Sequence, residues 1–79
     1  MHQILVVEDE SVIRGALRRL LERSGYAVSE ACTVTEAESH PLAEFDLIIS
    51  DLRLPGAPGT DLIRKGGKAP VLIMTSYAS

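Results

Sequence analysis

Acidic side chains occur at two places in this sequence, each directly after a short apolar run. Residues 4–7 are followed at once by Glu8 and Asp9. Residues 47–49 are followed, after one serine, by Asp51. Carboxylates that share one site raise one another's pKa unless a cation relieves them, and magnesium binds such oxygen ligands while keeping several waters. An aspartate can also attack a phosphoryl group as a nucleophile.

Each of these residues also has a simpler interpretation. Glu8 and Asp9 could be the acidic start of a helix, where the helix dipole favours negative charge. Asp51 could cap a turn or the next helix. Thr75, after a last apolar run at residues 71–74, could donate its hydroxyl to a phosphoryl oxygen or simply end a strand. The acid pair alone is a weak signal, but the pair, the aspartate and the threonine in this order are much stronger together.

The elements expected around these residues begin with strands and one long helix. The apolar runs at residues 4–7, 47–49 and 71–74 are typical of strands buried on both faces. Residues 11–24 are expected to form a helix because apolar side chains recur there at helical spacing. Residues 27–31 are a less apolar candidate strand, which we expect at a sheet edge.

Two weaker helices are expected in the second half of the chain. Thr33 and Glu36 have the spacing of a capping box, which indicates a helix that Pro41 would interrupt. Residues 61–65 could form one or two helical turns before the glycine pair at 66–67 stops them.

The resulting order of elements alternates between strand and helix along the whole chain. Such alternation favours a parallel sheet with right-handed crossovers, in which the carboxyl ends of all strands lie along one edge. Ligands of open α/β sheets bind at this edge. Asp9, Asp51 and Thr75 should therefore meet there, although they are far apart in the sequence.

Length and composition limit the possible functions. At 79 residues the chain is at most one small domain, which buries only roughly 60% of its unfolded surface and often needs oligomerisation. The net charge of −3 and the absence of a basic cluster argue against nucleic-acid binding. Arginines recur at helical spacing from Arg14 to Arg23, where we expect a solvated helix face. The single cysteine, with no visible signal peptide or bilayer-spanning run, favours the cytoplasm and no membrane contact.

The chain resembles the receiver domain of bacterial two-component response regulators over residues 4–78. The resemblance is carried by residues 4–10 (ILVVEDE), 46–56 (DLIISDLRLPG) and 70–75 (PVLIMT), with Gly59 in the loop between the last two. These motifs are most similar to those of receivers attached to enhancer-dependent transcription activators. This resemblance implies a flavodoxin-like α/β fold, here a parallel sheet of about four strands in the order 2-1-3-4 with about three helices.

The resemblance also implies a role for each candidate site residue. Asp51 would accept a phosphoryl group from a histidine kinase. Asp9 and Asp51 would bind magnesium directly, Glu8 would hold it through water, and the backbone carbonyl of Arg53 would bind it too. Thr75 would contact the phosphoryl group and move toward it on activation, while Gly59 would shape the loop beside the site.

The chain departs from the family at its carboxyl end. It stops soon after the fourth expected strand, so residues 1–79 would be a single truncated receiver domain. The lysine that contacts the phosphoryl group in the family has no counterpart, because Lys65 and Lys68 precede that strand. Residues 71–74 would then form an exposed edge, which is prone to pairing. We therefore expect a homodimer, through paired fourth strands or exchanged elements.

Three functions are compatible with these observations. The first is a signalling module, not an enzyme, that accepts a phosphoryl group on Asp51. The second is a pseudo-receiver that dimerises or binds a kinase without being phosphorylated. The third is a metal-dependent phosphohydrolase with Asp51 as nucleophile. Phosphatases of the haloacid-dehalogenase type carry a second acid two residues after the nucleophile, where this chain has Arg53.

Overall fold

The computed structural model describes residues 2–65 and 67–74 of the chain. The strands are β1 (Gln3–Val7), β2 (Ala27–Ala31), β3 (Leu47–Asp51) and β4 (Val71–Met74), and the helices are α1 (Ser11–Arg23), α2 (Val34–Glu38) and α3 (Asp61–Lys65), with a 3-10 turn, η1, at Leu42–Glu44. These elements confirm the expected alternation. The sequence did not predict η1, which begins directly after Pro41, and α2 already ends at Glu38, before that proline. None of the described helices has the length and apolar character needed to cross a membrane.

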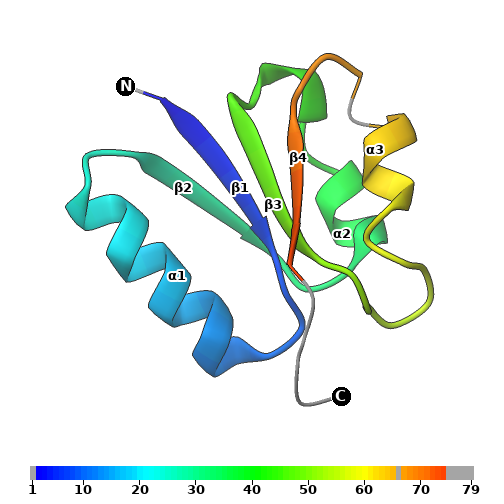
Figure 1. Cartoon of the computed structure of the whole chain (residues 1–79), viewed down its shortest axis with the longest axis horizontal. Helices are drawn as coiled ribbons and strands as arrows, with labels where there is room; N and C mark the ends of the chain where they lie inside the picture. The colour runs from blue at the N-terminus through cyan, green and yellow to red at the C-terminus, as the bar shows by residue number, and fades with distance from the viewer. Residues whose placement is uncertain (1, 66, 75–79) are drawn as a thin grey trace.

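The four described strands form one parallel sheet in the order β2-β1-β3-β4 (Figure 1). This order confirms the expected fold class, including the edge position of β2. Val7 of β1 pairs with Ser50 of β3, so Glu8 and Asp51, the residues that follow, come to lie at the same edge of the sheet. The register of two central strands thus positions the acidic residues.

Helices cover the two faces of the sheet unequally. On one side, α2 and α3 close a core that is lined by Leu5, Val7, Ala31, Val34, Ala37, Leu42, Phe45, Ile48, Leu62 and Ala69. On the other side α1 packs, through its half-buried Leu17 and Leu21, over three buried residues of the described part of the chain, Ile4, Val6 and Ile49. No residue of α1 is fully buried. The α1 side of the sheet is therefore only partly covered.

Strand β4 differs from the expectation that it is buried on both faces. Leu72 pairs with Ile49, whose side chain belongs to the α1 side of the core. Because paired residues of parallel strands point to the same face, Leu72 also lies on the α1 side, where it is 54% exposed. The cause is position, since α1 packs mainly against β2 and β1 and leaves the far end of the sheet open.

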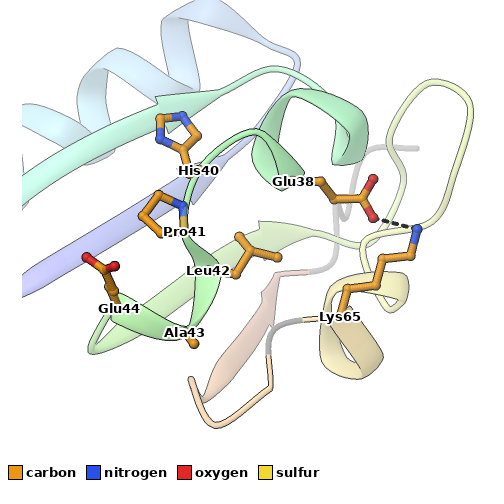
Figure 2. A pocket seen from close by; sticks show the side chains of 7 residues that line it. All are labelled: Glu38, His40, Pro41, Leu42, Ala43, Glu44 and Lys65. Atoms are coloured by element: carbon orange, nitrogen blue, oxygen red, sulfur yellow. Dashed lines mark ion pairs between the residues drawn. The ribbon is translucent and has the colours of Figure 1, made fainter.

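The helix ends follow the local signals in the sequence. Gly25, just beyond α1, has a φ of 95°, a conformation that favours glycine at helix ends. Thr33 Oγ1 accepts a hydrogen bond from the Glu36 N–H at 3.0 Å, while Glu36 Oε1 accepts from the Cys32 N–H at 2.9 Å. Both predicted capping residues therefore take part, although Glu36 accepts from the residue before the cap and not from the Thr33 N–H. Figure 2 shows Glu38 of α2 paired with Lys65 of α3, which joins the two helices.

Candidate functional site

Three carboxylates meet at the carboxyl ends of β1 and β3. One oxygen from each of Glu8, Asp9 and Asp51 lies within 4.8 Å of the others. Glu8 and Asp51 are only 4% and 8% exposed, whereas Asp9 faces the solvent. The two buried acids come from neighbouring strands, which brings together residues that are more than forty positions apart.

The electrostatics of this cluster are unfavourable without a cation. Burial raises the pKa of Glu8 above its usual 4.5, and the nearby Asp9 and Asp51 act in the same direction. The Glu10 N–H donates to Glu8 Oε2 at 3.0 Å and opposes this rise. An all-oxygen set of acidic ligands, two of them buried, suits a hard divalent ion such as magnesium. The donor set therefore fits the metal that the sequence predicts.

The loop after Asp51 closes tightly against the end of β3. The Gly59 N–H donates to the Leu52 carbonyl at 2.9 Å, and the Leu52 N–H donates to the Met74 carbonyl at 2.9 Å. A Cβ atom at position 59 would overlap the Asp51 carbonyl oxygen and crowd Ser50 Oγ. Only glycine allows this approach, which gives a physical reason for the loop-shaping role that the resemblance implies for Gly59.

The structure says less about the other two predicted site residues, Arg53 and Thr75. The Arg53 N–H points to Asp51 Oδ1 at a long 3.4 Å, and the Arg53 side chain is exposed. Residues 52–54 and 56–58 line a hollow of about 530 Å³ directly after Asp51. Thr75 lies outside the described residues, although Met74 before it pairs with Asp51. The metal role of the Arg53 carbonyl and the phosphoryl contact of Thr75 stay predictions.

The prediction that the α1 arginines form a solvated face is wrong for Arg14. Its side chain is 17% exposed and contacts Glu30 of β2 and the backbone carbonyl of Glu8. Arg18 also pairs with Glu30, and these guanidinium groups, Arg18 foremost, hold the pKa of that carboxyl below its usual value. The sequence offered one hint, the charged Glu30 inside an expected strand, but this hint did not show which arginine pairs with it.

Comparison with known proteins agrees with this geometry. The family model of the response regulator receiver domain matches residues 4–79. This chain belongs to that family. Among curated proteins, the receiver domain is 42% identical over 78 residues to the transcriptional regulatory protein ResD of Bacillus subtilis (strain 168), covering 94% of the chain and 32% of ResD. The chain thus spans about a third of the length of this relative.

Solved structures of other receivers superpose closely on this receiver domain. One is a response regulator from Burkholderia pseudomallei with a phosphorylated aspartic acid and a calcium ion, at 39% identity and a TM-score of 0.86, over 100% of this chain and 49% of that one. Another is TrrA from Thermotoga maritima in complex with Mg(2+)-BeF, at 36% identity and a TM-score of 0.87, over 99% and 72%.

A further hollow of this receiver domain lies apart from the acidic cluster. It has a volume of about 500 Å³ and is lined by Glu38, His40, Pro41, Leu42, Ala43, Glu44 and Lys65. Figure 2 shows that two of its charged residues, Glu38 and Lys65, form an ion pair with each other. Most of its residues lie before the amino end of β3, whereas the carboxylates lie at the carboxyl ends of β1 and β3. This hollow therefore contributes nothing to the candidate site.

Proposed function

We propose that this chain is a phosphoacceptor module in which Asp51 receives a phosphoryl group from a histidine kinase. The observation that supports this most directly is the meeting of Glu8, Asp9 and Asp51 within 4.8 Å of one another at the end of the sheet. Magnesium would be held by Asp9, Asp51 and the Arg53 carbonyl, with Glu8 acting through water. When bound, it would screen the negative charge of the site and of the incoming phosphoryl group.

Transfer of the phosphoryl group requires only one covalent step from the protein. A carboxylate oxygen of Asp51 attacks phosphorus and forms the new O–P bond, while the bond from phosphorus to the kinase histidine breaks and its electron pair returns to that nitrogen. One carboxylate oxygen of Asp51 lies within 4.8 Å of an oxygen of Glu8 and of Asp9, so the attacking group stands at the acidic cluster. Thr75 would donate its hydroxyl to a phosphoryl oxygen.

We propose that the domain acts in signalling and does not turn over a substrate as an enzyme. We also propose that it works in the cytoplasm and does not bind nucleic acid. The support for both proposals is the family relationship, together with the net charge of −3 and the single cysteine. A hydrolase of the kind considered above would need an acid two residues after the nucleophile, and Arg53 stands there.

The test is the intact mass of the protein after incubation with acetyl phosphate and magnesium. We expect one added phosphoryl group on the wild-type chain, none on Asp51→Asn, and none when the metal is chelated. Asp61→Asn is the matched control, because Asp61 also follows a loop but pairs with Arg64 at 3.3 Å on α3. This variant should be labelled like the wild type.

Other outcomes of this experiment identify the competing functions. A folded wild-type protein without any adduct would contradict the proposal and favour the pseudo-receiver. Steady hydrolysis of a generic phosphate ester that is lost in Asp51→Asn would favour the phosphohydrolase.

We also propose that a second copy of the 79-residue chain is a partner. Leu72 is 54% exposed on β4, and the other residues of this strand are only half-buried. In the described sheet β4 pairs with β3 alone, so its outer edge offers free backbone groups to another strand. Pairing of two such edges would bury Leu72 and extend the sheet.

A further inference from the structure

We propose that Arg14 is a positioning residue for the acidic corner formed by Glu8 and Asp9, an inference that rests on the magnesium-dependent function proposed above. Arg14 does not belong to the acidic cluster. It donates a hydrogen bond to the backbone carbonyl oxygen of Glu8. This contact restrains the backbone from which the Glu8 and Asp9 side chains extend.

The contacts around the Glu8 peptide support this role. Its N–H donates to the Ala31 carbonyl of β2 at 3.0 Å, and its carbonyl accepts from Arg14 Nη1 at 2.7 Å. Arg14 Nε in turn donates to Glu30 Oε1 at 3.1 Å. Arg18 binds the second oxygen of Glu30 but has no hydrogen bond to Glu8 among the described contacts. Arg14 alone of this pair therefore connects β2 to the acidic corner.

A clamp is needed at this corner because its carboxylates repel one another. Glu8, Asp9 and Asp51 would lower their mutual repulsion if the chain after β1 moved away from β3. A charge-assisted hydrogen bond from a largely buried guanidinium opposes that movement, since such bonds are stronger than neutral ones. Holding the ligands in place before the ion arrives favours metal binding.

Whether loss of Arg14 weakens or strengthens magnesium binding distinguishes a positioning role from a purely electrostatic one. Arg14 carries a positive charge near a site for a cation, so removing that charge should strengthen magnesium binding if only the charge mattered. If Arg14 acts by holding the Glu8 carbonyl, its removal should weaken binding instead. Groups that orient metal ligands indirectly cost about tenfold or more in affinity when they are lost.

The experiment compares Arg14→Met with Arg18→Met in the 79-residue chain. Magnesium affinity is measured by NMR titration, and the carbonyl ¹³C shift of Glu8 is recorded in the metal-free protein as a direct report on its hydrogen bond. We expect Arg14→Met to weaken magnesium binding by about tenfold and to move the Glu8 carbonyl shift upfield. Arg18→Met, which also loses an ion pair with Glu30, should change neither.

A second variant keeps the inference testable if Arg14→Met does not fold. Glu30→Gln retains Arg14 but removes the charge that anchors it, and it should weaken binding in the same direction by a smaller factor. Unchanged or tighter binding in a folded variant, with an unchanged Glu8 carbonyl shift, would overturn the inference. A wild-type protein that binds no magnesium would instead contradict the proposed function, while the metal-free carbonyl shift would still test the clamp.

Discussion

The surroundings of Glu8 disfavour the charged form of its side chain. Burial raises its pKa, and Asp51 and Asp9 add to the rise. Because the folded-state pKa lies above the unfolded value of 4.5, the folded state holds more protons than the unfolded one between these two values. The free energy of unfolding therefore falls as pH rises through this window.

We expect Glu8→Gln to stabilise the metal-free protein at pH 7, because it removes this charge and keeps the shape of the side chain. The gain should be of order 1 kcal/mol, or a few degrees in Tm. It should shrink as the pH is lowered toward 4, where wild-type Glu8 is protonated. Thermal unfolding by circular dichroism at several pH values measures both.

The matched control is Glu44→Gln, since Glu44 is an exposed residue of η1. It should leave Tm nearly unchanged. An excess of magnesium should reverse the order, so that the wild type becomes more stable than Glu8→Gln. A lower Tm for Glu8→Gln in chelator at pH 7 would contradict the assignment of strain to this carboxylate.

At the residue scale, the sequence predicted the acidic cluster but not the arginine behind it. Glu8, Asp9 and Asp51 could be found because each follows an apolar run, and the carboxyl ends of parallel strands converge. Arg14 could not, because its partners depend on how α1 crosses β2. Helical spacing places Arg14 on one side of α1 but does not show that Glu30 and a backbone carbonyl lie beneath it.

At the scale of elements, the loop between β3 and α3 depends on Gly59. Its backbone approaches the Asp51 carbonyl so closely that an added methyl group must displace one of them. We expect Gly59→Ala to lower the free energy of unfolding by about 1–3 kcal/mol, as overpacked sites do. It should also slow the labelling of Asp51, because the displaced atom belongs to that residue.

Gly15→Ala provides a matched comparison with the opposite sign. Gly15 lies inside α1, where an added Cβ would meet only Arg19 Nη1 at 3.6 Å. The same methyl group should stabilise the protein there by about 0.5–1 kcal/mol through helix propensity. Urea unfolding of both variants tests this pair, and equal effects at the two positions would show that the close approach at Gly59 is unimportant.

The elements themselves could be predicted where the signal was local. The apolar runs and the helical spacing of α1 predicted bounds that differ from the structure by at most two residues. The Thr33 capping signal held as well. The turn η1 was missed because Leu42–Glu44 has no periodicity of its own and is shaped by Pro41 and by the burial of Leu42. The exposure of β4 depends on its neighbours in space, which a local pattern does not contain.

At the scale of the whole molecule, unequal coverage of the sheet predicts self-association. We expect the chain to sediment as a dimer at micromolar concentration and Leu72→Lys to shift it toward monomer, because a lysine on an edge strand opposes pairing. Ile63→Lys is the matched control, since Ile63 is also 54% exposed but belongs to helix α3 and not to the edge strand. A wild-type monomer, or dissociation by both variants alike, would contradict pairing through β4.

The sheet order was predicted only through the family resemblance, because alternation of elements shows that a sheet is parallel without showing which strands are neighbours. The imbalance between the two cores follows from that order. Among the described residues, ten buried side chains belong to the core on the α2–α3 side and three to the core on the α1 side. We therefore expect the overall stability to depend mainly on the α2–α3 face.

The clamp on Glu8 also has a consequence for the order in which the protein is made. All of its parts, from β1 through Arg14 to Glu30 and Ala31, belong to the first strand–helix–strand unit. A ribosome makes the amino end first, so the atoms that hold the acidic corner exist before β3 is synthesised. Asp51, the third carboxylate of the cluster, therefore enters the chain only after the groups that restrain Glu8.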